Sequence, residues 1–305
     1  MTSDNEAAAG RQILVTIGCV IAGTLLGAIL QFGLLAALGY DLERVQSEGY
    51  GLLSPAALAT LLATNQVCGY LLPGVVAAVL LYRSRWLRGV HLSPPPAPTK
   101  LALGLLCFLG TLYLTAALAA LNASVELADW QVDIETDVQT VLERLIRGEG
   151  VVGLTVALLL IAVLPALGEE LVFRGLLQPA LIVRLRSSHL GVWVTAAVFG
   201  AVHLQFAGLL PRIFVGGVLG FLAFYSQRLW VPVAAHALFN GAQVAAVRAG
   251  ALDTEAPAAT VAPDSLTLLL ACAIAAASLY FLLPLTQPDA PPPGPDGGAP
   301  TLPAA

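Results

Sequence analysis

The stretch VVGLTVALLLIAVLPALGEELVFRGLL (residues 151–177) places a long apolar run directly beside two acids and an arginine. An apolar run of about 20 residues is long enough to cross the hydrocarbon core of a bilayer. Ionisable side chains are costly at that depth and usually face a cavity or one another. The stretch therefore predicts a membrane helix, over 151–168, that ends at a polar site.

The rest of the chain also has the composition of a membrane protein. Hydrophobic residues make up 58% of the 305 positions and charged residues only 11%, against roughly 25% charged in an ordinary soluble domain. The mean hydropathy is +0.84. We expect an all-α polytopic integral membrane bundle of about eight transmembrane helices. The apolar runs lie at 13–39, 58–82, 101–121, 151–168, 189–207, 211–227, 230–247 and 265–286.

These runs divide the chain into five parts. Residues 1–12 are an N-terminal cytoplasmic segment, 13–121 contain the first spans, 122–150 form an outer loop, 151–286 contain the polar motifs and the last span, and 287–305 are a Pro/Gly-rich tail. The composition of the tail predicts disorder. The distribution of arginines places both termini in the cytoplasm. The arginine-rich, lysine-poor composition suggests a high-GC bacterium and hence the inner membrane.

The outer loop contains the pattern of an amphipathic helix. Its apolar residues recur at helical spacing: Ile134, Val138, Val141, Leu142, Leu145 and Ile146. Acids and arginines occupy the other face, so we expect a helix over 134–146 that lies on the outer membrane interface. Asn122 begins an Asn-Ala-Ser triplet, which we interpret as coincidental rather than as a glycosylation site.

Three polar motifs interrupt the apolar runs of the second half of the chain: EELVFR at 169–174, FGAVH at 199–203 and HALFN at 236–240. Glu170 and Arg174 are four residues apart with the acid first, so they can pair on one helix face. Glu169 is rotated by about 100° from Glu170 and can point into a cavity. We expect Pro165 to break the helix before the acids and Gly168 to add freedom there.

After this break, residues 171–186 would form a short or re-entrant helix. His236 and Asn240 are four residues apart, as are Phe199 and His203, so each pair shares a helix face. If those faces converge with Glu169, the site holds a base, two imidazoles and an amide donor, which is sufficient to hydrolyse a peptide bond.

Two chemistries are open for such a site. Glu169 with His203 can activate a water, while His236 and Asn240 donate hydrogen bonds to the developing oxyanion. Alternatively, Glu169, His203 and His236 bind Zn²⁺, which activates the water bound to it. No basic patch with interleaved aromatic residues points to nucleic acid.

With the three motifs in this order, residues 150–245 resemble the CAAX prenyl protease and bacteriocin-processing (CPBP, or Abi) family. The resemblance implies an intramembrane endopeptidase, commonly labelled a metalloprotease, that acts on a membrane-associated and in some cases lipidated peptide or protein. It implies that Glu169 acts as the base together with His203, and that Glu170 and Arg174 support these two residues. It also implies that His236 and Asn240 bind the oxyanion. The soluble zinc-protease motif HExxH is absent, so Zn²⁺ is implied by the resemblance alone.

Two other functions use the same residues. A non-proteolytic immunity or scaffold protein would keep the pocket and act by binding partners. A proton-coupled transporter would use Glu169 and the histidines as a relay, but the inverted repeats that favour this function are not evident. Prenylated CAAX tails, bacteriocin leaders and other membrane peptides are all open as substrates.

Overall fold

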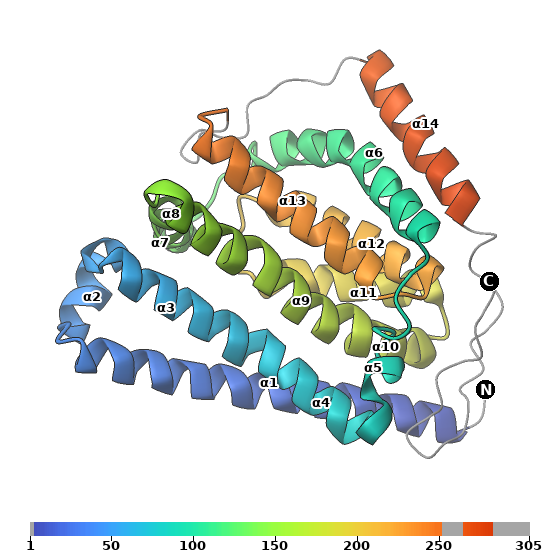
Figure 1. The fold of residues 1–305 in the computed structure, drawn as a ribbon, viewed down its shortest axis with the longest axis horizontal. Coiled ribbons are helices and arrows are strands. Elements are labelled where there is room, and N and C mark those ends of the chain that lie inside the picture. The colour runs from blue at the N-terminus through green and yellow to red at the C-terminus, as the bar shows by residue number, and fades with distance from the viewer. Residues whose placement is uncertain (1–2, 252–264, 283–305) are drawn as a thin grey trace.

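The protein is a bundle of helices in the computed structural model, which describes residues 3–251 and 265–282 (Figure 1). Within those residues the structure contains helices and no strand, which confirms the all-α prediction. The main helices are α1 (Ser3–Ala37), α2 (Leu42–Glu48), α3 (Pro55–Gln66), α4 (Leu72–Tyr82), α5 (Trp86–Gly89), α6 (Pro98–Asn122), α7 (Asp129–Ile146), α8 (Gly150–Ala157), α9 (Leu164–Glu170), α10 (Gln178–Leu185), α11 (Ser188–Ala201), α12 (Leu209–Ser226), α13 (Trp230–Arg248) and α14 (Ser265–Leu282).

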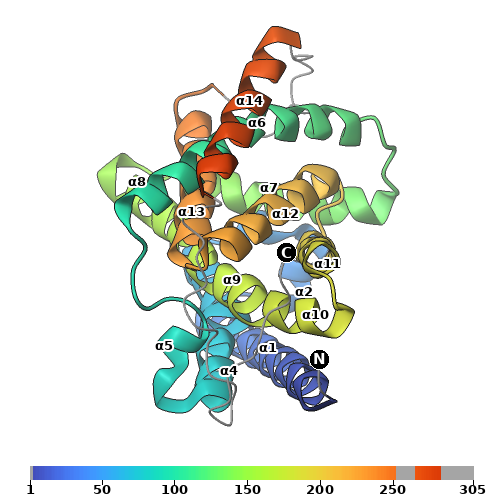
Figure 2. The same ribbon diagram turned by 90° about the vertical axis from the view of Figure 1, so that its right-hand side faces the viewer.

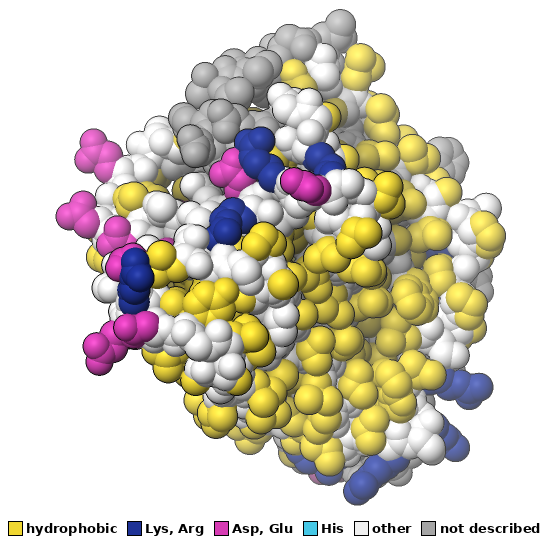
Figure 3. Space-filling view, turned by 60° about the vertical axis from the view of Figure 1, so that its left-hand side comes forward, with side chains coloured by type: hydrophobic (Ala, Val, Ile, Leu, Met, Phe, Trp, Pro, Cys, Tyr) yellow, Lys and Arg dark blue, Asp and Glu magenta, His cyan; other side chains and the backbone are white. Residues whose placement is uncertain are grey.

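Five helical stretches are long and apolar enough to cross a membrane: Asp4–Ala37, Pro55–Gly89, Pro98–Asn122, Gly150–Leu185 and Leu209–Ser226. Apolar side chains on them are strongly exposed, such as Val151 at 79% and Leu14 at 74%. Figure 3 shows this surface as a broad hydrophobic area between two groups of charged residues. The protein is therefore a multi-pass membrane protein.

The remaining three predicted spans differ from these five in length or polarity. The prediction at 189–207 corresponds to α11, which is only 14 residues long, and that at 230–247 to the more polar α13. The span at 265–286 corresponds to α14 as far as Leu282. At the other end, α1 begins at Ser3, so residues 3–12 of the predicted N-terminal segment are helical and continuous with the first span. The tail 287–305 lies outside the described residues.

The predicted break at Pro165 is wrong. The chain is helical without interruption from Gly150 to Leu185, so the expected re-entrant segment is the second half of one long helix. A π-helical segment, η4 (Leu158–Val163), directly precedes Leu164 and Pro165. A π-helical turn lets a helix accommodate a residue that lacks the N–H and crowds the preceding turn. Gly168 packs closely, because a Cβ there would lie 3.0 Å from the Leu71 backbone nitrogen.

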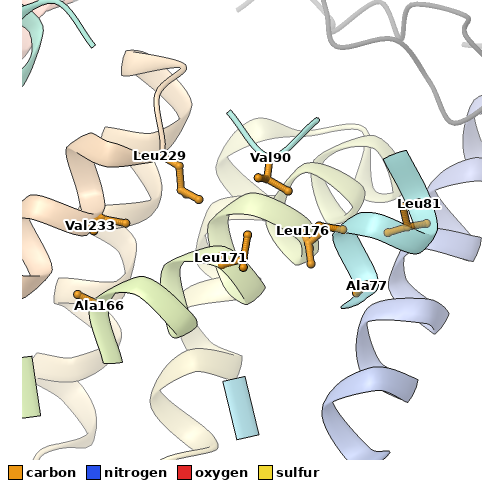
Figure 4. Packing of buried hydrophobic residues seen from close by; sticks show 9 residues of the cluster. Ala77, Leu81, Val90, Ala166, Leu171, Leu176, Leu229 and Val233 are labelled. Carbon is orange, nitrogen blue, oxygen red and sulfur yellow. The ribbon is translucent and has the colours of Figure 1, made fainter. Parts of the chain in front are cut away.

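The same combination occurs at two other prolines. Segment η2 (Val67–Leu71) precedes Pro73, and η5 (Leu171–Leu177) precedes Pro179. Around η5 the packing is dense: Leu171 and Leu176 are buried with Val90, Leu229 and other apolar residues, as Figure 4 shows. The helix that carries the acids is therefore locally underwound before its prolines, and dense packing holds it in place.

The bundle has three layers in both ribbon views. Helices α6 and α14 lie on one side and α1 with α4 on the other, with α9, α11, α12 and α13 between them (Figures 1 and 2). Gly216, Gly217 and Gly220 let α12 pack closely on α11, as a Cβ at Gly217 would lie 2.5 Å from the Trp193 ring. The middle layer is the one that carries the three polar motifs.

The amphipathic helix predicted at 134–146 is confirmed as the second part of α7. Leu145 and Ile146 are buried, as expected for its apolar face. An acid, Glu135, is also buried, with 8% of its surface exposed. The sequence pattern had placed the acids of this helix on the polar side, so Glu135 needs a partner inside the protein.

Candidate active site

The three polar motifs converge in the middle layer. Glu169 and Glu170 end α9, and Arg174 follows one turn later in η5. His203 comes directly after α11, and His236 lies in α13. The exposed fraction is 4% for Glu169, 0% for Glu170 and 5% for His236. Ionisable groups at such burial need partners. Here the EELVFR motif contacts residues of both other motifs.

Glu170 is the centre of a buried ion network. Its Oε1 accepts a hydrogen bond from Arg174 Nη1 at 2.9 Å and lies 2.8 Å from His236 Nδ1. Arg174 Nη2 also donates to the Gly216 carbonyl at 2.9 Å. The Glu170–Arg174 pair predicted from the spacing is therefore present. The contact with His236, which joins α9 to α13, was not predicted.

Glu169 has a different environment from its neighbour. Its Oε2 is buried and has no hydrogen-bond partner among the described residues. It faces two imidazoles, with His203 Nε2 at 3.8 Å and His236 Nε2 at 4.0 Å. These distances are too long for direct hydrogen bonds but allow one small polar molecule to bridge the three atoms. The expected convergence of Glu169 with both histidines is thus observed.

In each imidazole, the contact of Nδ1 determines whether Nε2 can donate or accept a hydrogen bond. His203 Nδ1 lies 2.6 Å from the Phe199 carbonyl, which can only accept, so this nitrogen carries the proton. His236 Nδ1 likewise donates to the Glu170 carboxylate. In a neutral imidazole the other nitrogen then has a lone pair. Both Nε2 atoms therefore face the Glu169 carboxylate as acceptors, an arrangement that a water or another proton donor between them stabilises.

Phe199 packs against the Arg174 guanidinium and both imidazoles of the site. Its ring lies 4.8 Å from the His203 ring and 6.0 Å from the His236 ring, both edge to face. The Arg174 guanidinium lies 4.4 Å from the Phe199 ring centroid, within the range of a cation–π contact. Phe173 adds a further edge-to-face contact at 5.2 Å. The first residue of the FGAVH motif thus forms an apolar wall beside His203, with which its spacing predicted a shared face.

Asn240 has a neighbour that the sequence did not predict. Its Nδ2 donates to the Ile161 carbonyl at 3.1 Å. In a regular helix this carbonyl would accept from residue 165, which is a proline and has no N–H. Asn240 therefore satisfies a carbonyl freed at the π-helical segment. One of its two amide hydrogens is used in this way, so its role toward an oxyanion stays a prediction.

The donor chemistry around Glu169 suits zinc, but the spacing does not form a metal shell. Two imidazoles that donate through Nδ1 to an acceptor resemble zinc ligands with their supporting contacts. Donors in a tetrahedral zinc shell are roughly 3.3 Å apart, whereas those around Glu169 Oε2 are at 3.8 and 4.0 Å. Over residues 3–251 and 265–282, no three His, Cys, Asp or Glu side chains are grouped to hold a metal.

Three polar residues near the site were missed from the sequence. Arg212 bonds Gln205, two residues after His203, and Asn122 is buried with 4% exposure. A signal for Glu135 was present, because it precedes Val138, Leu142 and Ile146 by three, seven and eleven residues and so shares their apolar face. An acid on an apolar stripe indicates a buried partner.

Known proteins are similar to the part of the chain that contains this site. Residues 151–242 match the family model described as type II CAAX prenyl endopeptidase Rce1-like. A stretch of 72 residues is 32% identical to the putative membrane peptidase YdiL of Bacillus subtilis (strain 168), which covers 24% of this chain and 29% of that protein. No solved structure gives a significant match. The segment that carries all three motifs is thus similar to CAAX-type membrane endopeptidases.

Proposed function

We propose that this protein is an intramembrane endopeptidase in which Glu169 and His203 activate the water that cleaves the peptide bond. The observation that carries the proposal is the buried, unpaired Oε2 of Glu169 opposite two imidazole nitrogens. A carboxylate that only stabilised the fold would be hydrogen-bonded or ion-paired at this burial. The adjacent Glu170 differs in that its Oε1 bonds both Arg174 and His236, although its Oε2 is also buried without a partner.

The geometry supports a general-base mechanism. A water between Glu169 Oε2 and His203 Nε2 would donate one hydrogen to each and direct its lone pair at the scissile carbonyl. As the C–O bond forms, Glu169 takes a proton from the water. When the C–N bond breaks, the same proton passes from Glu169 to the leaving amine. The products are a carboxyl terminus and an amino terminus, and the carboxylate is regenerated.

The oxyanion that forms in this step requires a donor. His236 can serve if its Nε2 also carries a proton, since Glu170 already binds its Nδ1. The charges of Glu169, Glu170, Arg174 and such a His236 would then sum to zero, which is favourable in a medium of low dielectric constant. The free amide hydrogen of Asn240 is the second candidate donor.

The substrate is a peptide that reaches the site from the bilayer. The similarity over 151–242 supports a CAAX-type substrate, while the wide apolar surface fits any membrane-associated peptide, lipidated or not. Zn²⁺ is an alternative to this general-base mechanism. Glu169, His203 and His236 would be its ligands, and they would have to move closer together to form a tetrahedral shell. No step above passes through a metal.

The test is cleavage of a farnesylated CAAX peptide and of an apolar leader peptide by the full chain in liposomes. We expect Glu169→Gln to lower kcat roughly 10²–10⁴-fold, because the general base is lost. Glu143→Gln is the matched control, since Glu143 forms a surface ion pair with Arg147. Equal cleavage by wild type and Glu169→Gln would refute the assignment.

Metal analysis of the same preparations separates the two chemistries. The general-base form predicts cleavage that persists after chelation, with no stoichiometric zinc in the active protein. One zinc per chain, lost together with activity on chelation, would establish the alternative. If neither peptide is cleaved but a cellular phenotype survives Glu169→Gln, the protein acts by binding rather than by hydrolysis.

A further inference from the structure

The loop that carries His203 is held by side chains from three other helices. Residues 202–208 connect α11 to α12. Asn122, at the end of α6, donates from Nδ2 to the Phe206 carbonyl at 2.9 Å and accepts at Oδ1 from the Leu210 backbone nitrogen at 2.7 Å. One side chain thus joins the loop to the first turn of α12.

Helix α7 supplies the second set of contacts. Glu135 Oε1 accepts a hydrogen bond from the Ala207 backbone nitrogen at 2.8 Å. A hydrogen bond to a carboxylate is stronger than one between neutral groups. On the same helix, the Trp130 ring lies edge to face with Phe206 at 5.2 Å. The buried acid that the sequence pattern left unexplained is therefore the partner of this loop.

The third set comes from α12. Arg212 donates from Nη1 to the Gln205 carbonyl at 2.9 Å and from Nη2 to the Gln205 side-chain oxygen at 2.7 Å. Successive loop residues 205, 206 and 207 each have a backbone group bonded to a side chain from a different helix. These hydrogen bonds restrict the conformations open to the loop.

The turn directly after His203 has an unusual backbone. Leu204 has φ of +54°, a left-handed conformation that residues other than glycine rarely adopt. Strain of this kind persists where the surrounding contacts fix it, and it occurs often at functional sites. Because Leu204 is the next residue, a change in this turn would redirect the His203 side chain.

We infer that Asn122 and Glu135 are positioning residues for His203, which act by fixing the loop at 204–210. The inference rests on the proposed function, since positioning matters only if His203 takes part in the reaction. It also assigns a role to the outer helix α7, which lies outside the segment similar to known peptidases. Both polar groups of Asn122 are used inside the protein, which gives this asparagine a structural role.

The experiment compares Glu135→Leu, Asn122→Ala and Glu135→Gln in the full chain in detergent. The control is Glu143→Leu, the same change on the same helix at a residue that pairs with Arg147. The readouts are hydrogen exchange of residues 203–212, the rate of carbethoxylation of His203 by diethyl pyrocarbonate, and kcat and KM for the farnesylated CAAX peptide. The first two require no peptidase activity.

For Glu135→Leu and Asn122→Ala we expect faster exchange in 203–212, faster labelling of His203, and a kcat lowered roughly 10- to 100-fold with little change in KM, because misplacement of a catalytic group acts on the chemical step. Glu135→Gln keeps an acceptor for the Ala207 N–H and should restore most of the loss. Unchanged exchange and labelling, or faster exchange with unchanged kcat, would overturn the inference. A wild type without activity refutes the proposed function, while the exchange and labelling data still decide whether the loop is held.

Discussion

At the scale of single residues, Glu169 and Glu170 are chemically identical neighbours with opposite environments. Both carboxylates have a buried Oε2 without a hydrogen-bond partner among the described residues, but Glu170 bonds Arg174 and His236 through Oε1, whereas Glu169 Oε2 faces two imidazoles at 3.8 and 4.0 Å. One residue along a helix is a rotation of about 100°, and this rotation alone separates them. The pairing of Glu170 with Arg174 could be read from their spacing. The contact of Glu170 with His236 could not, because 66 residues and a helix packing separate the two.

The buried network should respond to mutation as a unit. Glu170→Leu leaves the Arg174 guanidinium buried without its carboxylate, which should lower the free energy of unfolding by about 3–5 kcal/mol. Arg174→Met should have a similar effect. The double variant removes both charges and should be more stable than either single variant, as measured by reversible unfolding in detergent.

Activity distinguishes the two roles of this network. The double variant also removes the acceptor for His236 Nδ1, so we expect it to be folded but inactive. If the double variant lost as much stability as the two single variants together, Glu170 and Arg174 would not be coupled. That result would contradict the observed contact of 2.9 Å.

At the scale of elements, the long helix Gly150–Leu185 shows where sequence rules failed. Proline was expected to end the helix, because it lacks an N–H and crowds the preceding turn. The π-helical segment η4 relieves that conflict, and Asn240 from α13 bonds the freed Ile161 carbonyl. The compensation comes from a residue 79 positions away, so no local pattern could reveal it.

Pro165→Ala tests the purpose of this arrangement. Alanine restores the N–H, which can bond within a regular helix and remove the π-helical turn. Loss of that one extra residue per turn would rotate Glu169 by about 100° relative to the preceding helix. We expect unchanged or higher thermal stability with kcat reduced at least about tenfold. Pro98→Ala, at the exposed start of α6, is the control, and full activity of Pro165→Ala would contradict this role.

At the scale of the whole molecule, composition alone predicted a helical membrane protein, and the five long apolar helices bear this out. The packing between layers was less accessible to the sequence. The glycines of α12 permit close packing, and the structure identifies the neighbours that approach them. Gln178 Nε2 donates to the Gly220 carbonyl at 2.9 Å, parallel to the contact of Arg174 with Gly216.

Gly220→Ala should push α12 away from α10 and α11. The added Cβ would lie 2.7 Å from Gln178 Oε1 and 2.8 Å from Val192 Cγ1. Overpacking of this kind costs about 1–3 kcal/mol, which unfolding in detergent would measure. Gly18→Ala in α1 is the control, because nothing lies within 4 Å of its added Cβ. Equal stability of the two variants would show that α12 does not depend on this close approach.

The most direct test of the account is a single turnover of peptide cleavage in H₂¹⁸O, with mass analysis of both the product and the protein. If the water held by Glu169 and His203 attacks the peptide carbonyl, one ¹⁸O appears in the new carboxyl terminus and none in Glu169. Incorporation of ¹⁸O into the Glu169 carboxylate would instead indicate a covalent acyl intermediate, and would contradict the role of Glu169 as a general base.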